Sequence, residues 1–269
     1  MSKPLVLFHA NCADGFCSAW IARRAMPDAE FVAVNYSESP PDVTGLEVYI
    51  LDFSYKRPVM LEMLESAAHT VILDHHKTAV QELEGLVHDN RLEAKNALII
   101  FDMNKSGGRL TWEYFFPGQP SPWLVDYTED RDLWLWKLPE SKELNAALAS
   151  YPQTFEQWDD LCAKSKLGIL CKEGAAILRY QRQTVESQAK NAVEIEMDGH
   201  RVLSLNATVL ISEIGEKLAQ GRPFSATYFI RGDGKKVWSL RSREGGIDVS
   251  EIAKQHGGGG HKATAGFTE

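Results

Sequence analysis

The N-terminal third of the chain repeats one pattern, in which a short apolar run ends abruptly in ionisable side chains. The runs are PLVLFHA, EVYILDFS, TVILDHHK and NALIIFDMN, and the residues that end them are His9, Asp52, Asp74, His75, His76 and Asp102. Runs of Val, Ile and Leu this continuous predict strands that are buried on both faces, as in a parallel sheet. This pattern constrains the fold more than any other feature of the sequence.

Helical patterns lie between these runs. They are DGFCSAWIARRAM, RPVMLEMLESAA and GGRLTWEYFF, the last with Ser106 as its expected N-cap. Strand and helix therefore alternate, which predicts βαβ units and an α/β fold with a parallel, Rossmann-like sheet. Ligands of such sheets bind beyond the carboxyl ends of the strands. We expect the polar residues that end the runs to line a site at that edge.

The C-terminal part of the chain has a different pattern of apolar and polar residues. Residues 153–190 read as helical, and short alternating runs separated by DG and GDGK turns begin near residue 192. We predict a first domain over residues 1–150, a helical connector over 151–191 and a smaller α/β domain over 192–269. Near its end, Asp248 and Glu251 have capping-box spacing, and Gly257 can terminate that helix.

Composition excludes several classes of protein. The chain has 269 residues, 44% hydrophobic and 25% charged, which is typical of a soluble globular protein. A net charge of -8 argues against duplex DNA as a partner. We find neither a cationic leader nor a membrane-length apolar run, so we expect a cytoplasmic protein with no membrane partner. Because no C-x-x-C pair occurs, we expect small, reduced apolar thiols at Cys12, Cys17, Cys162 and Cys171.

The polar strand ends predict a metal site. Crowding several carboxylates onto one sheet edge is electrostatically costly unless a cation is present. Mixed imidazole and carboxylate ligands suit Mn²⁺, Fe²⁺, Co²⁺ or Zn²⁺ better than Ca²⁺, and the groups suffice for two ions. The segment VDYTEDRDLW is either a solvated turn or the source of a further carboxylate; its acids are Asp126, Glu129, Asp130 and Asp132.

The C-terminal HGGGGHKATAG has two interpretations. An isolated Gly run is typical of a flexible linker. This one follows a helical pattern, and WSLRSR supplies Arg241 and Arg243 nearby in sequence. If the two segments are adjacent in space, backbone N–H groups and guanidinium could bind an anion such as phosphate.

The order of these motifs resembles the DHH phosphoesterase superfamily with the DHH-associated C-terminal domain of nanoRNases and RecJ-like exonucleases. HANCADG resembles its first motif, LDFS its second, LDHHKTA its third and EDRD its fourth. WSLRSR through GGGGHKATAG resembles the substrate-binding signature of its C-terminal domain. The resemblance covers nearly the whole chain.

The resemblance implies two divalent cations, usually Mn²⁺, that activate a water for attack on phosphorus. The metal ligands that it implies are His9, Asp14, Asp52, His75 and Asp130, with Asp52 between the two ions. His76 would contact the scissile phosphate, and Asp74 would orient His75. The substrate-binding residues that it implies are Arg241, Gly257, Gly258, Gly259, Gly260 and His261.

The chain departs from the family pattern in its first motif. That motif typically carries two acids after the initial residue, whereas HANCADG has only Asp14, with Asn11 and Cys12 where the other would stand. We expect one metal position to be weaker, or to be filled through Asn11 or water. In the fourth motif, Asp126 and Asp132 compete with Asp130.

The predicted function is metal-dependent hydrolysis of phosphodiester or phosphate ester bonds. The net charge favours small substrates such as short single-stranded oligonucleotides, dinucleotides or nucleotide bisphosphates. Two alternatives are an inorganic polyphosphatase or pyrophosphatase and a non-catalytic nucleotide-binding regulator. A dehydrogenase is disfavoured because G-x-G-x-x-G is missing after the first strand. The sequence leaves the oligomeric state open, a homodimer included.

Overall fold

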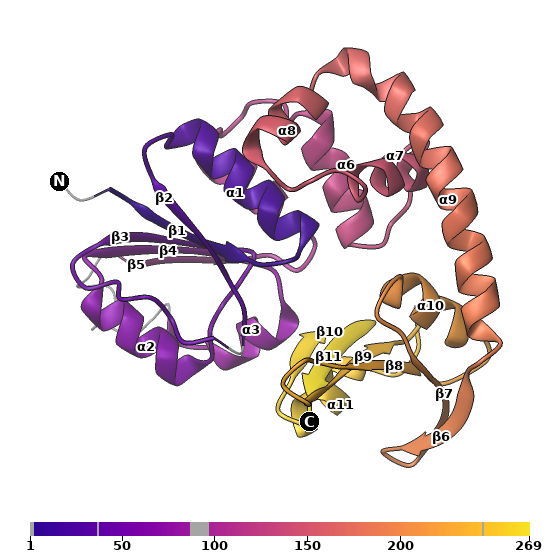
Figure 1. Cartoon of the computed structure of the whole chain (residues 1–269). Coiled ribbons are helices and arrows are strands. Elements are labelled where there is room, and N and C mark those ends of the chain that lie inside the picture. The colour runs from indigo at the N-terminus through magenta and orange to yellow at the C-terminus, as the bar shows by residue number, and fades with distance from the viewer. Residues whose placement is uncertain (1–2, 37, 87–96, 244) are drawn as a thin grey trace. The chain divides into compact units, whose positions relative to one another are not determined.

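The computed structural model describes residues 3–36, 38–86, 97–243 and 245–269. The chain divides into two compact units, Met1–Ile177 and Leu178–Glu269 (Figure 1). The boundary falls inside α9 (Leu167–Ala189), a 23-residue helix in the segment predicted as a helical connector. Within the described ranges, none of the helices has both the length and the apolar character that crossing a membrane requires.

The first unit contains a parallel five-stranded sheet with strand order β2-β1-β3-β4-β5. Its strands are β1 (Leu5–His9), β2 (Glu30–Val34), β3 (Glu47–Leu51), β4 (His69–Asp74) and β5 (Ala97–Phe101). The predicted α/β class and the four strands expected from apolar runs are confirmed. The sequence prediction missed β2, an edge strand that has only one fully buried residue, Val34.

Helices cover both faces of this sheet. α1 (Ala13–Ala25) and α5 (Gly107–Phe115) pack on one face and α2 (Arg57–Ser66) on the other, while α3 (Lys77–Glu82) follows β4. α6 (Trp123–Asp132), α7 (Ser141–Leu148) and α8 (Phe155–Leu161) pack against α1 in a separate cluster. Side chains alternate along each strand, so Leu7 packs with Met60 of α2 and Val6 packs with Ala22 of α1 on the opposite face (Figure 1). This two-sided burial explains why the strands read as continuous apolar runs.

The second unit contains a mixed six-stranded sheet with strand order β10-β11-β9-β8-β7-β6, in which only the β7–β8 pair is parallel. Its strands are β6 (Val193–Met197), β7 (His200–Asn206), β8 (Ser225–Ile230), β9 (Lys236–Arg241), β10 (Gly259–His261) and β11 (Thr264–Thr268). Two helices, α10 (Ile211–Leu218) and α11 (Val249–Gln255), accompany it. The side chain of Asp248 accepts a hydrogen bond from Ser250 N, which confirms the predicted N-cap of α11.

Candidate active site

Three neighbouring strands of the parallel sheet end in polar side chains at one edge. His9 is the last residue of β1, Asp52 directly follows β3, and Asp74 is the last residue of β4. β2 and β3 flank β1 on opposite sides, so the strand order changes direction there. Ligands of open α/β sheets bind at such a switch point. The structure thus brings His9 and Asp52 to the position where this architecture binds ligands.

Asp52 lies at the centre of the polar edge. Its carboxylate is 1% exposed, and its two oxygens face different residues. Oδ1 lies 3.0 Å from Nε2 of His75, and Oδ2 lies 3.5 Å from Nδ1 of His9. The backbone of Asp52 is left-handed, with φ 55°, a conformation that only Gly, Asn and Asp adopt readily. This backbone conformation places the Asp52 carboxylate between His9 and His75.

Three clusters of candidate metal ligands share this edge, and one of them consists of Asp52, Asp74 and His76. In each, one nitrogen, sulfur or carboxylate oxygen from every member lies within 4.8 Å of the others. The Cys12 cluster comprises His9, Cys12 and Asp52, and the Asp132 cluster comprises Asp14, His75 and Asp132. Because Asp52 Oδ1 contacts His75, Asp52 connects the Cys12 and Asp132 clusters.

The start of α5 holds Asp14 in place. The backbone N–H groups of Gly107 and Gly108 donate to its carboxylate oxygens at 2.5 and 3.0 Å. A Cβ atom at Gly107 would lie 2.5 Å from Cβ of Asp52, so only glycine lets the helix approach this closely. The sequence prediction missed this support, although a Gly pair that opens a helix after a strand is a recognisable signal.

The fourth motif presents a different acid from the one assigned by resemblance. Asp130 accepts hydrogen bonds from the backbone N–H groups of Lys137 and Leu138, at 2.9 and 3.4 Å, so both its oxygens stabilise the turn after α6. Asp126 forms an ion pair with Arg109. Asp132 lies 3.5 Å from Nε2 of His75. This geometry differs from the prediction of Asp130 and favours Asp132.

Like charges crowd the Asp132 cluster. Burial, and then the charges of Asp52 and Asp132, raise the pKa of Asp14 well above its usual range. Burial would lower the pKa of His75, but its hydrogen bond with Asp52 and the charge of Asp132 raise that pKa to about 10. One imidazolium can balance only one of three carboxylates. The surplus of buried negative charge fits a bound divalent cation.

Metal addition is expected to raise the thermal stability of chelator-treated protein. A ligand that binds only the folded state at 100 times its Kd adds about 2.7 kcal/mol of stability. Asp132→Asn should reduce the rise in Tm on addition of Mn²⁺. Asp130→Asn should lower the Tm of the metal-free protein and leave that rise unchanged, because Asp130 bonds a turn. Scanning fluorimetry measures both effects. A smaller metal-induced rise in Tm for Asp130→Asn but not for Asp132→Asn would identify Asp130 as the ligand.

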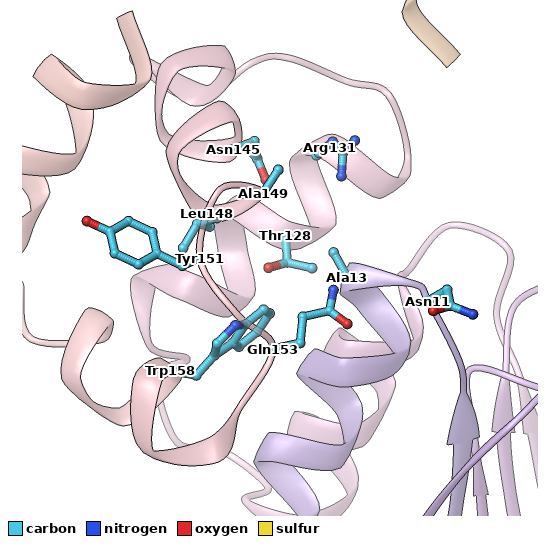
Figure 2. A pocket seen from close by; sticks show the side chains of 10 residues that line it. All are labelled: Asn11, Ala13, Thr128, Arg131, Asn145, Leu148, Ala149, Tyr151, Gln153 and Trp158. Atoms are coloured by element: carbon cyan, nitrogen blue, oxygen red, sulfur yellow. The ribbon is translucent and has the colours of Figure 1, made fainter. Parts of the chain in front are cut away.

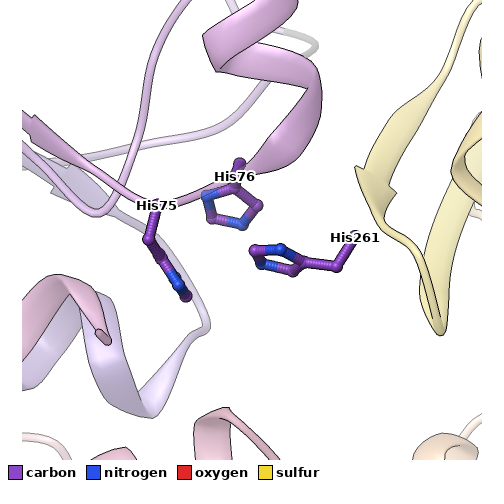
Figure 3. A group of neighbouring side chains, drawn as sticks. All are labelled: His75, His76 and His261. Carbon is purple, nitrogen blue, oxygen red and sulfur yellow. The ribbon is translucent and has the colours of Figure 1, made fainter. Parts of the chain in front are cut away.

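Asp74 orients His76. Its Oδ1 lies 2.7 Å from Nδ1 of His76, and its Oδ2 accepts a hydrogen bond from Ser54 at 2.7 Å. Asp74 Oδ1 also accepts a hydrogen bond from the backbone N–H of His75 at 2.7 Å. The rings of His75 and His76 lie side by side after β4, with centroids 4.8 Å apart (Figure 3). The expected orientation of His75 by Asp74 is therefore replaced by a pairing between Asp74 and His76.

The Arg241 and Gly-rich segments are adjacent in the second unit. Arg241 pairs with Thr264 in the β9–β11 ladder, and Gly259, Gly260 and His261 form β10 beside β11. The Gly run is therefore part of a sheet rather than a linker. Gly257 and Gly258 connect α11 to β10. The guanidinium of Arg241 donates to Ser212 Oγ at 2.7 Å, and burial lowers its pKa to about 10.

A pocket of about 390 Å³ lies beside the first motif (Figure 2). This volume lies at the lower end of the range of small-molecule sites, roughly 300–1,000 Å³. Its lining residues come from α1, α6, α7, α8 and the loops beside them; they are Asn11, Ala13, Thr128, Arg131, Asn145, Leu148, Ala149, Tyr151, Gln153 and Trp158. Asn11, the expected substitute metal ligand, is among the residues that line this pocket.

Comparison with known proteins identifies relatives in sequence. No protein-family model matches the chain. The uncharacterized protein R106 of Acanthamoeba polyphaga mimivirus is 30% identical over 98% of the chain and 66% of its own length. The oligoribonuclease NrnB of Bacillus subtilis is 26% identical over 76% of the chain and 54% of its own length. The chain thus spans about half to two thirds of the lengths of these curated relatives.

Solved structures with the same fold include a phosphodiesterase and an exonuclease. The pGpG-specific phosphodiesterase PggH of Vibrio cholerae aligns with a TM-score of 0.51 and 15% identity, over 99% of this chain and 93% of that one. The exonuclease RecJ bound to manganese aligns with a TM-score of 0.50 and 15% identity, over 98% of this chain and 85% of that one. At this identity the likeness concerns the fold.

The motifs, the fold and the sequence relatives agree. HANCADG, LDFS and LDHHKTA occur in the order expected of one superfamily, and the structure brings their polar residues to one sheet edge. NrnB shares sequence similarity over three quarters of the chain, and PggH and RecJ share the arrangement of its elements. In its motifs, its fold and its similarity to NrnB, the chain thus resembles the DHH phosphoesterase superfamily.

Proposed function

We propose that the chain is a metal-dependent phosphodiesterase that hydrolyses short oligonucleotides or small nucleotides. One observation carries this proposal: the two oxygens of the buried Asp52 carboxylate face two separate clusters of metal ligands. A carboxylate shared in this way is typical of sites that hold two divalent cations for phosphoryl transfer.

The proposed ligand set combines the sequence prediction with the geometry. His9 and Asp52 would hold one cation, and Asp14, Asp52, His75 and Asp132 would hold the other. Asp132 takes the place of Asp130 in this assignment because it faces His75. The oxygen and nitrogen donors of the second group suit Mn²⁺ or Mg²⁺. When bound, the cations would supply positive charge to the phosphate and activate the attacking water.

We assign His76 to contact with the scissile phosphate. Burial would lower its pKa, but the charge of Asp74 and the hydrogen bond with it raise that pKa above the usual value. A protonated imidazole can bind a phosphate oxygen and stabilise charge that develops on it. Asp74 is then a positioning residue, because it acts on the reaction only through the ring of His76.

Asp74→Asn is expected to shift the alkaline limb of the pH–rate profile to lower pH. The charge of Asp74 keeps His76 protonated to a higher pH, so activity that needs the protonated ring is lost as pH rises through its pKa. Removing that charge lowers the pKa and brings the loss earlier. The profile of kcat/KM against pH measures the shift. A uniform fall in rate with no shift would mean that Asp74 has a structural role alone.

Three observations support a small substrate. The relatives NrnB and PggH are named for oligoribonucleotides and for pGpG. The net charge of -8 disfavours long polyanions. The pocket beside Asn11 has the volume of a small-ligand site, and Trp158 Nε1 is a buried donor without a hydrogen-bond partner among the described residues. In the second unit, Arg241, the Gly257–Gly260 segment and His261 are proposed to bind the nucleotide.

The test is hydrolysis of a substrate panel with Mn²⁺, Zn²⁺ and Co²⁺. The panel contains dinucleotides, RNA and DNA of a few nucleotides, long single strands, cyclic dinucleotides, nucleotide bisphosphates and polyphosphate. We expect turnover of dinucleotides and short RNA, with little turnover of long strands. Turnover of polyphosphate alone would instead indicate a polyphosphatase. No turnover of any substrate on the panel, with metal binding intact, would indicate a nucleotide-binding regulator.

A further inference from the structure

The thiol of Cys12 lies where the first motif lacks its second acid. One imidazole nitrogen of His9, Sγ of Cys12 and a carboxylate oxygen of Asp52 lie within 4.8 Å of one another. Ligands around a tetrahedral Zn²⁺ with bonds of roughly 2.0–2.3 Å are about 3.3–3.8 Å apart. His9 Nδ1 and Asp52 Oδ2, at 3.5 Å, already have this separation. A small movement of the sulfur would complete a three-residue site.

Two buried polar atoms in this cluster point to a ligand. Nδ1 of His9 and Oδ2 of Asp52 are both shielded from solvent, and neither has a hydrogen-bond partner in the part of the chain that the structure describes. Buried polar atoms are normally paired, because an unpaired one costs free energy. A nitrogen and a carboxylate oxygen that face each other without a hydrogen bond are arranged as two ligands of one cation.

Cys12 has no structural task that explains its position. It is the N-cap residue of α1, yet its side chain makes no capping hydrogen bond. Ser, Thr, Asp or Asn would serve better as a cap. Cys17 is part of a hydrophobic cluster, and Cys162 and Cys171 pack against that cluster. Within the described ranges, Cys12 is in none of the hydrophobic clusters. The prediction of an apolar role therefore fits the other three cysteines better than Cys12.

We propose that Cys12 is a metal ligand and that the Cys12 cluster holds a thiophilic cation such as Zn²⁺ or Co²⁺. Soft thiolate ligands favour these cations over Mn²⁺ and Mg²⁺, whereas the oxygen and nitrogen donors of the Asp132 cluster do not. On binding, the S–H bond breaks, a bond from sulfur to metal forms and the proton passes to the buffer. The two positions of the site are thus chemically unequal. This inference rests on the proposed two-metal site but not on the identity of the substrate.

The test is the absorption spectrum of Co²⁺ bound to the chelator-treated full chain. Coordination by a thiolate produces a charge-transfer band in the near-ultraviolet, which oxygen and nitrogen ligands do not. We expect the band in the natural chain and in Cys162→Ser, which removes a thiol outside the cluster, and its loss in Cys12→Ser. Circular dichroism checks that each variant is folded. A band that persists in Cys12→Ser, or that is absent when the natural chain binds Co²⁺, would overturn the proposal.

A second variant measures selectivity. Cys12→Asp restores the acid that the motif lacks, so the protein should still bind two cations. Loss of the thiolate should lower the ratio of Zn²⁺ to Mn²⁺ affinity, measured by competition titration. An unchanged ratio would contradict a ligand role for Cys12. Neither readout needs turnover. A Co²⁺–thiolate band in a chain that hydrolyses none of the substrates on the panel would therefore contradict the proposed function but support the metal site.

Discussion

Asp52→Asn is expected to lower kcat/KM for phosphodiester hydrolysis by about 10³-fold or more, equivalent to about 4 kcal/mol of transition-state stabilisation. Asp52 faces His9 on one side and His75 on the other, so its loss weakens both clusters together. Asn is the appropriate replacement because it tolerates the left-handed backbone at this position, φ 55°. Steady-state kinetics at saturating metal measure the effect.

The stability of this variant separates a functional role from a structural one. Burial would raise the pKa of Asp52, but its hydrogen bond with His75 lowers that pKa, so neutralising Asp52 removes a stabilising charge from the metal-free protein. The Tm without metal should fall, and the rise in Tm on metal addition should also shrink, whereas a purely structural role would leave that rise unchanged. Asp102→Asn is the matched control: Asp102 follows β5, but its carboxylate accepts from Asn104 N. If Asp102→Asn impaired hydrolysis equally, the site would extend to β5.

The sequence was sufficient to predict the sheet and its polar edge. Val6, Leu7, Ile50 and Ile72 are fully buried by helices on one face or the other, which produces the continuous apolar runs from which the strands were predicted. In a parallel sheet the strands' carboxyl ends meet at one edge. The proximity of His9, Asp52 and Asp74 follows from that geometry with no further information.

The choice among the acids of the fourth motif needed tertiary structure. Asp130 and Asp132 are separated by about 200° around α6, so only one of them can face the sheet edge. The sequence of this helix has no strong amphipathic pattern to show which face that is. Its orientation is set by contacts that are distant in sequence, including the ion pair between Arg109 and Glu129. The contact of Gly107 with Asp14 also depends on packing between distant segments, so the sequence shows the Gly pair that permits it but not its partner.

Gly107→Ala is expected to lower the free energy of unfolding by about 1–3 kcal/mol, the usual cost of overpacking a filled interior, and to weaken metal binding on the order of 10- to 100-fold. The added methyl group would lie 2.5 Å from Cβ of Asp52, so α5 must move away from the sheet edge. That movement also withdraws the N–H group that holds Asp14. Denaturant unfolding and metal titration measure the two effects.

Gly168→Ala is the matched control for this change. Gly168 lies in α9, and a Cβ atom there would meet nothing within 4 Å, so helix propensity alone should make this substitution neutral or stabilising by up to about 1 kcal/mol. The two Gly→Ala changes should therefore have opposite signs. Equal effects of both would exclude the close approach at Gly107 as the cause.

A double-mutant cycle identifies the atoms responsible. Asp52→Gly removes the Cβ atom that the new methyl group would meet, and Gly suits the left-handed backbone there. If contact with Asp52 causes the loss of stability, Gly107→Ala should cost less in the Asp52→Gly background than in the natural chain. Recovery should be partial, because Cα of Asp52 would still lie 2.9 Å away. If the effects of the two substitutions on the free energy of unfolding were strictly additive, contact with the Asp52 side chain would not be the cause of the loss. Gly107 would then act only through its hydrogen bond to Asp14.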